Sequence, residues 1–124
     1  MEERNTYKIY EGGNIGEVQI ADDVVASIAG LAATEVSGVL SLAGGVTSEL
    51  ISKFGMKKLS KGVKVAVEDG NASVSVAINV AFGSNIPDVS AKVQEKVKTT
   101  VENMTGLNVS GVNVKVLGIG EEQH

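Results

Sequence analysis

The sequence contains no cysteine and no tryptophan, and its single histidine is the last residue, His124. Without cysteine the chain forms no disulfide bond and no zinc–thiolate or iron–sulfur site, and it offers no thiolate nucleophile. A terminal histidine usually belongs to a tag or a tail, so neither a Ser-His-Asp triad nor a histidine-based metal site can be assembled. The sequence therefore predicts no catalytic residue, no metal site, no cofactor and no enzymatic activity.

Aromatic residues and positive charge are also scarce. Aromatics make up 3% of the chain and hydrophobic residues 43%, so the core must consist of Val, Ile, Leu and Ala. The formal net charge of -4 argues against a nucleic-acid partner, because such binding domains are usually basic. No apolar run approaches the roughly 18 residues of a membrane span, and the N-terminus lacks an export signal. We therefore expect a cytoplasmic protein without direct membrane insertion.

Adjacent carboxylates occur at Asp22-Asp23, Glu68-Asp69 and Glu121-Glu122. Neighbouring residues on a helix or strand point in different directions, so these pairs do not converge on one reacting atom or metal ion. The first pair suits a helix N-terminus and the second a turn. Glycine-rich segments of this chain do not follow a strand and open a helix, as phosphate-binding loops do. These residues are expected to be structural.

Residues 85–106 carry the start and stop signals of one long helix. Asn85 can cap the first turn, Pro87 falls where a missing N–H is tolerated, and Gly106 supplies the positive φ favoured at a helix exit. Apolar residues recur between them mostly at four-residue spacing, which predicts one buried stripe. The stripe consists of Ile86, Val89, Val93, Val97, Val101 and Met104.

Two alternating segments, 63–67 and 73–82, flank Asp69-Gly70 and predict a β-hairpin. One face of the second strand carries large apolar side chains. The other face is small and uncharged, and we take it as a candidate interaction face for a second copy or a protein partner. Its residues are Ser73, Ser75, Ala77, Asn79 and Ala81. The alternative is that the N-terminal segment or residues 47–61 cover this face within the monomer.

Shorter patterns complete an α+β fold. They predict strands at residues 16–20, 39–42 and 109–116, a helix that begins at Asp22, and a short helix within residues 47–62. The order β-α-β-(short α)-β-β-α-β favours two main helices packed on one face of a mixed sheet. We expect a single domain at residues 15–119, a flexible N-terminal tail at residues 1–14 and a C-terminal tail at residues 120–124.

Lysines cluster in one segment. The candidate basic patch consists of Lys53, Lys57, Lys58 and Lys61. With the nearby Lys64, these lysines are five of the eleven basic residues of the chain. A solvated helix face is the simpler interpretation. If four lysines faced an anionic membrane, they would contribute roughly 4 kcal/mol, which is only about millimolar binding. Lysines alone would not hold the chain at a membrane.

Five short segments carry a family resemblance when they are taken in order. They are Gly16-Glu17-Val18-Gln19-Ile20-Ala21, Glu35-Val36-Ser37-Gly38-Val39, Gly62-Val63-Lys64-Val65, Asn85-Ile86-Pro87-Asp88-Val89 and Met104-Thr105-Gly106-Leu107. With them the chain resembles the alkaline-shock protein family, the general or envelope stress-response proteins of Gram-positive bacteria. The resemblance runs from about Gly16 to Ile119. One departure is Ala21, where relatives often place a capping Ser, so Asp22 becomes the expected cap.

The resemblance implies a small cytoplasmic α+β domain without catalytic residues. Some family members are held at the membrane by an integral-membrane anchor protein and assemble further, whereas others are linked to the control of fatty-acid synthesis. The leading hypothesis is therefore a non-enzymatic stress-response scaffold or adaptor that acts through protein contacts and self-association. The alternative is a regulatory module that binds a metabolic enzyme or a small ligand. A pocket between the helices and the sheet would favour this alternative.

Overall fold

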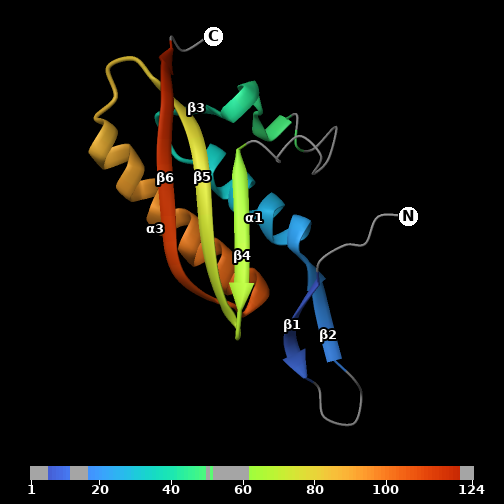
Figure 1. The fold of residues 1–124 in the computed structure, drawn as a ribbon. Coiled ribbons are helices and arrows are strands. Elements are labelled where there is room, and N and C mark those ends of the chain that lie inside the picture. Colours follow the sequence, from blue (N-terminus) through green and yellow to red (C-terminus); the bar gives the residue numbers. More distant parts are fainter. Residues whose placement is uncertain (1–5, 12–16, 50, 52–61, 121–124) are drawn as a thin grey trace.

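The computed structural model describes residues 6–11, 17–49, 51 and 62–120, which fold as a single α+β domain (Figure 1). This confirms the expected fold class. In chain order the elements are β1 (Thr6–Glu11), β2 (Glu17–Ala21), α1 (Asp22–Thr34), β3 (Val39–Leu42), the 3-10 turn η2 (Ala43–Gly45), β4 (Val63–Glu68), β5 (Asn71–Ala81), α3 (Ile86–Thr105) and β6 (Asn108–Gly120).

Strand β5 is the centre of a four-stranded mixed sheet (Figure 1). Along one side it pairs in parallel with β6 over its whole length. Along the other side it pairs antiparallel first with β4 and then with β3, so these two short strands lie end to end. Every strand of this sheet therefore contacts β5. β6 forms one border of the sheet, and it has an extra, unpaired residue at Ser110 and another at Leu117.

The N-terminal part differs from the expectation of a tail. Residues 6–11 form β1, which pairs antiparallel with β2 in a separate two-stranded sheet. The strand expected at residues 16–20 is β2, but it does not join the main sheet. Because β2 runs directly into α1, its backbone partner comes from the segment immediately before it, and the polar composition of that segment gave no sign of this local pairing.

The hairpin between β4 and β5 follows the expected turn chemistry. Asp69 and Gly70 have φ angles of 52° and 77°, the left-handed pair that a two-residue hairpin requires. The opposed residues include Val65 with Val74 and Glu68 with Asn71. This register directs alternate β5 side chains toward the helices and leaves the others on the opposite face.

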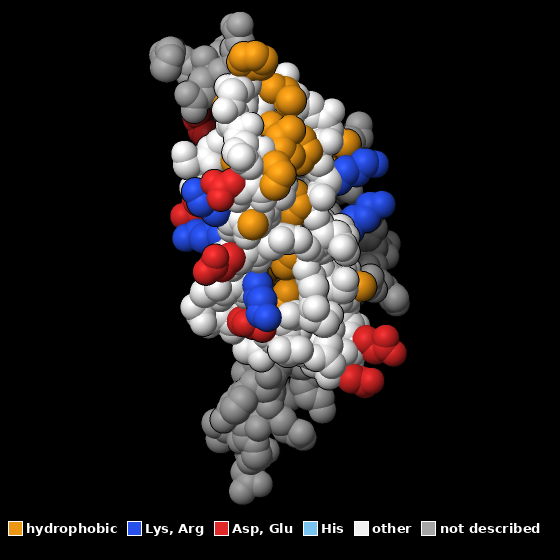
Figure 2. Space-filling view, turned by 90° about the vertical axis from the view of Figure 1, so that its left-hand side faces the viewer, with side chains coloured by type: hydrophobic (Ala, Val, Ile, Leu, Met, Phe, Trp, Pro, Cys, Tyr) orange, Lys and Arg blue, Asp and Glu red, His pale blue; other side chains and the backbone are white. Residues whose placement is uncertain are grey.

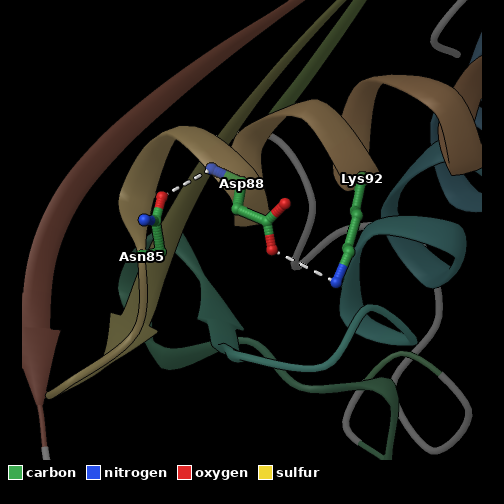
Figure 3. Close-up of polar contacts among 3 residues, drawn as sticks. All are labelled: Asn85, Asp88 and Lys92. Carbon is green, nitrogen blue, oxygen red and sulfur yellow. Dashed lines mark hydrogen bonds and ion pairs between the residues drawn. The ribbon is translucent and has the colours of Figure 1, made fainter.

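Both ends of α3 are confirmed. The Asn85 side chain accepts a hydrogen bond of 3.0 Å from the backbone N–H of Asp88, and Asp88 forms a 3.2 Å ion pair with Lys92 one turn later (Figure 3). Both ion-pair side chains are largely exposed, so their pairing contributes at most about 1 kcal/mol. At the other end Gly106 has a φ of 76°, and its N–H donates to the carbonyl of Glu102.

The buried stripe of α3 ends differently from the sequence prediction. Met104 is 65% exposed, whereas Thr105 is buried. Strict four-residue spacing from Val101 leads to Thr105 and turns Met104 away from the sheet. The Thr105 hydroxyl donates to the Val101 carbonyl at 2.6 Å and accepts from the Leu107 N–H at 3.1 Å, which satisfies a polar group inside the core.

Helix α1 begins after Ala21, whose side chain makes no capping hydrogen bond. Asp22 is therefore a first-turn residue and not the cap that the sequence predicted. A carboxylate in the first turn still stabilises the helix, because its negative charge interacts favourably with the positive end of the helix dipole. The buried side of α1 is mostly alanine, which allows α3 to pack closely against it.

The two helices and the sheet enclose one aliphatic core. Helix α3 packs mainly over β6 and α1 over β3 and β4, on the same side of the sheet. The largest fully buried side chains are Leu42, Ile78, Val25, Val74, Val76, Val80, Val93, Val97, Val101 and Val109. No aromatic ring is among them, as the composition predicts.

Substitution of Gly106 by Val should lower the free energy of unfolding by at least about 1 kcal/mol, because a β-branched residue resists the left-handed conformation. A Cβ at this position would meet no atom within 4 Å, so the cost is conformational and not steric. Gly106→Asn is the matched control, since Asn adopts this conformation more readily. Urea denaturation measures both, and an unchanged midpoint for Gly106→Val would contradict the expectation.

Candidate functional site

The candidate interaction face lies on the side of β5 opposite the helices. Strand alternation places Ala72, Val74, Val76, Ile78 and Val80 in the core, and their neighbours Ser73, Ser75, Ala77, Asn79 and Ala81 point the other way. Ser73 is exposed, Ser75, Ala77 and Asn79 are half-buried, and Ala81 is buried. We call this set, with the side chains beside it on β4 and β6, the open face.

The sheet register supplies the neighbours of these residues. Ser73 lies between Ala66 and Gly111, Ser75 lies between Lys64 and Asn113, and Ala77 lies beside Lys115. A shallow hollow of about 440 Å³ occupies this area. Its lining consists of Gly62, Lys64, Ser75, Val76, Ala77, Asn113, Val114, Lys115 and Leu117. The centre is small and uncharged, and two cationic side chains flank it.

The sequence did not identify Lys64, Lys115 and Leu117 as members of this surface. Lys64 belongs to β4, and Lys115 and Leu117 belong to β6. Only the pairing across β5 brings them together, and the parallel pairing joins residues about forty positions apart. Alternation within β5 predicts which β5 residues belong to the open face. The charged residues of β4 and β6 beside them can be placed only when the pairing register of the sheet is known.

One end of the open face is closed by contacts within the sheet. The Asn79 side chain donates to the Ser41 hydroxyl at 3.1 Å and to the Leu42 carbonyl at 3.4 Å. A Cβ at Gly118 would lie 3.0 Å from the Asn79 side-chain oxygen, so β6 approaches closely there. Ala81 is only 8% exposed. The part available to a partner is therefore centred on Ser73, Ser75 and Ala77.

Acidic side chains do not form a metal-binding group within the described residues, where no cluster of three or more His, Cys, Asp or Glu occurs. Asp22 and Asp23 lie in the first turn of α1, and Glu68 and Asp69 lie at the β4–β5 hairpin. The third pair, Glu121-Glu122, falls outside the described residues. The arrangement of these carboxylates is that of helix and turn signals.

The space between the helices and the sheet is occupied by the aliphatic core, where Val93 and Val97 pack with the buried valines of β5. A separate hollow of about 410 Å³ lies on the surface between the end of α1 and α3. Charges of both signs line it, including Glu35, Lys92 and Lys96. It does not have the apolar lining with few polar groups that is usual for a small-ligand site.

The candidate basic patch of Lys53, Lys57, Lys58 and Lys61 lies outside the described residues, as does most of the short helix expected nearby. Its geometry is therefore not part of the site. In the described segments, no helix is both long and apolar enough to cross a bilayer.

Comparison with known proteins gives a consistent result. A family model described as "Asp23 family, cell envelope-related function" matches residues 11–120; Asp23 is here a family name and does not refer to residue 23. YqhY of Bacillus subtilis is 39% identical over 110 residues, which cover 89% of this chain and 82% of YqhY. YloU of the same organism is 34% identical over 110 residues, covering 84% and 88%.

A stress response regulator gls24 homolog of Streptococcus pyogenes is 31% identical over 117 residues, covering 94% of this chain and 65% of the relative. Among solved structures, a MamM CTD variant aligns with a TM-score of 0.49 and 14% identity over 77% of this chain and 93% of that chain. A structural similarity at this level carries no argument about function.

Proposed function

Since this chain belongs to the Asp23 family, which has a cell envelope-related function, we propose that it is a non-enzymatic stress-response protein that acts as a scaffold or adaptor. Its proposed place is the cytoplasmic side of the membrane, and its proposed partner is an integral-membrane protein that holds it there. The name of its streptococcal relative, a stress response regulator, supports the stress-related role. Among the described residues no group of three or more His, Cys, Asp or Glu could hold a metal ion, which supports a role that needs no metal ion.

The open face is the observation that carries the proposal. Ser73, Ser75 and Ala77 have short uncharged side chains, so another protein surface can approach the strand closely. Lys64 and Lys115 flank this centre and would attract acidic groups at the border of a partner surface. An acidic rim around small or apolar residues is therefore the partner chemistry that fits.

The double substitution Ser75→Lys and Ala77→Lys should weaken partner binding at least about tenfold, because two new charges would enter the uncharged centre beside two existing lysines. The measurement is retention of the protein on membranes from alkaline-stressed Gram-positive cells. The matched control is Thr99→Lys with Asn103→Lys, which adds the same charge to the exposed side of α3. The control should bind like wild type.

Protease treatment of the membranes distinguishes a protein partner from a lipid partner. Retention of the chain on treated membranes should be lost only if the partner is a protein. Retention that survives the double substitution would remove the open face as the contact. Circular dichroism checks folding, and a misfolded double variant would mean that this face is covered within the monomer. Recovery of a fatty-acid synthesis enzyme in place of a membrane protein would support the regulatory alternative.

A further inference from the structure

The open face contains four polar side chains that the fold itself does not use. Ser75 lies beside Lys64 on one side and beside Asn113 on the other. Lys115 lies two residues further along β6, beside Ala77. Within the described part of the chain, the side chains of Lys64, Ser75, Asn113 and Lys115 form no hydrogen bond and no ion pair. They line the hollow of the open face together, so their polar groups are available to a ligand there.

The other asparagines on this side of the sheet are all engaged. The Asn108 amide donates to the Asn71 side-chain oxygen at 2.8 Å, and the Asn71 amide donates to the Asp69 carbonyl at 3.3 Å. The Asn79 amide is held by β3 in the same way. Among the described residues Asn113 has no such partner, although it lies on the same sheet. Its amide is therefore not needed to hold the strands together.

Positive charge is unopposed at the hollow. The described residues that line it include two lysines and no acidic residue. Glu68, the acidic residue of β4, is four positions from Lys64 and thus about 13 Å along the strand, which exceeds the Debye length of about 8 Å at physiological salt. In Figure 2, on the flank of the hydrophobic band away from α3, positive side chains (blue) lie apart from negative ones (red). The hollow therefore favours an anionic ligand.

The spacing of the two lysines fits two carboxylates. Lys64 and Lys115 lie on opposite sides of β5 and two residues apart along it, so their Cα atoms are about 12 Å apart. A single carboxylate would require both lysine side chains to lie extended across β5. In an extended chain, residues four positions apart lie on the same side at about 13 Å. A segment that crosses β5 can therefore place one acidic residue near each lysine.

The polar centre of the hollow favours an extended segment over a helix. A helix already satisfies its own backbone N–H and C=O groups, so a docked helix would bury the Ser75 hydroxyl and the Asn113 amide without partners. An extended segment presents free backbone groups that this hydroxyl and this amide can bond. The short side chains of Ser75 and Ala77 leave room for such a backbone, provided that its middle residue is small.

We propose that the partner of the open face binds through an extended acidic segment, with two Asp or Glu residues four positions apart and a small residue midway. One carboxylate pairs with Lys64 and the other with Lys115, and the backbone between them bonds Ser75 and Asn113. This identification rests on the proposed function, because it names the chemistry of the partner that the open face would hold. Lysines at positions 75 and 77 would occupy the place of the small middle residue.

NMR titration of the isotope-labelled full chain with a synthetic peptide tests the segment. The peptide carries two aspartates separated by alanine, serine and alanine. The backbone signals of Lys64, Ser75, Asn113 and Lys115 should shift on its addition. Lys64→Glu with Lys115→Glu should weaken binding at least about tenfold, and a peptide with lysines in place of both aspartates should bind this variant. Lys96→Glu with Lys98→Glu, which reverses two exposed charges on α3, is the matched control and should bind like wild type.

Two further ligands test the spacing. A peptide in which the two aspartates are adjacent, and inorganic phosphate, should each cause much smaller shifts at the same concentration. Shifts as large as those of the spaced peptide would overturn the proposal, because they would show only a general attraction of anions. Unchanged affinity of the spaced peptide for the Lys64→Glu with Lys115→Glu variant would overturn it as well. Circular dichroism confirms the fold of this variant, in which both substituted positions are exposed.

Retention on membranes from alkaline-stressed cells distinguishes failure of this inference from failure of the proposed function. The acidic segment predicts that Lys64→Glu with Lys115→Glu is lost from the membranes and that the α3 control is retained. If the reversed variant is retained but Ser75→Lys with Ala77→Lys is not, the open face is the contact and the acidic segment is wrong. If both variants are retained, the open face is not the contact and both proposals fail.

Discussion

Val97→Asp should abolish the folded state or destabilise it by about 3–5 kcal/mol, a large part of the roughly 5–15 kcal/mol by which a domain of this size is stable. Val97 is fully buried in the middle of α3 and belongs to the same core cluster as Val76 and Ile78 of β5. A carboxylate there would have no partner and no water. The position therefore tests directly how the helix is docked on the sheet.

Thr99→Asp is the matched control for this substitution. Thr99 is exposed on the same helix, two residues from Val97. The control substitution therefore introduces the same aspartate at the surface instead of in the core. The control should change the free energy of unfolding by less than about 1 kcal/mol. Chemical denaturation followed by circular dichroism compares the two. A Val97→Asp variant that unfolds like wild type would mean that this side of α3 is not packed in the core.

Gly38→Ala should lower the free energy of unfolding by about 2 kcal/mol or more. Gly38 has a φ of 99°, and a Cβ there would lie 2.8 Å from a Val89 methyl group and 3.3 Å from the Ser84 hydroxyl. The cost combines an unfavourable backbone conformation with overpacking. This turn brings the chain from α1 into β3 and carries a carbonyl that accepts from Ala81 at 2.8 Å.

Two further variants separate these two costs. Gly44 also has a positive φ, but no atom lies within 4 Å of a Cβ added there. Gly44→Ala should therefore show only the cost in free energy of the unfavourable backbone conformation. Val89→Ala removes the methyl group that the new Cβ would meet. In the double variant, Gly38→Ala should therefore cost less than it does in wild type, which a double-mutant cycle of unfolding energies reports. Equal costs in both backgrounds would argue against the steric contact.

Elements with local signals could be predicted from the sequence. Asn85, Pro87 and Gly106 define the ends of α3, and Asp69-Gly70 defines the hairpin, because each of these residues acts on the backbone beside it. Alternation along β5 separated its buried face from its open face up to Val80, but at the end of the strand Ala81 is buried and Phe82 is exposed. These features need no knowledge of the rest of the fold.

Features that depend on distant pairing could not be predicted. The pattern at residues 16–20 predicts a strand. It does not show that this strand pairs with β1 instead of joining the main sheet. The last α3 position in the core is Thr105, and its suitability depends on the backbone groups of Val101 and Leu107 around it. Lys115 joins the open face only through the parallel register of β5 and β6.

Photo-cross-linking from position 75 in living cells under alkaline stress tests the open face most directly. A photoreactive residue in place of Ser75 should form an adduct with a second protein, because the centre of the open face would lie within the contact. The same residue in place of Glu95, exposed on α3, should not. Adducts from position 95 and none from position 75 would contradict the assignment of the open face as the partner surface.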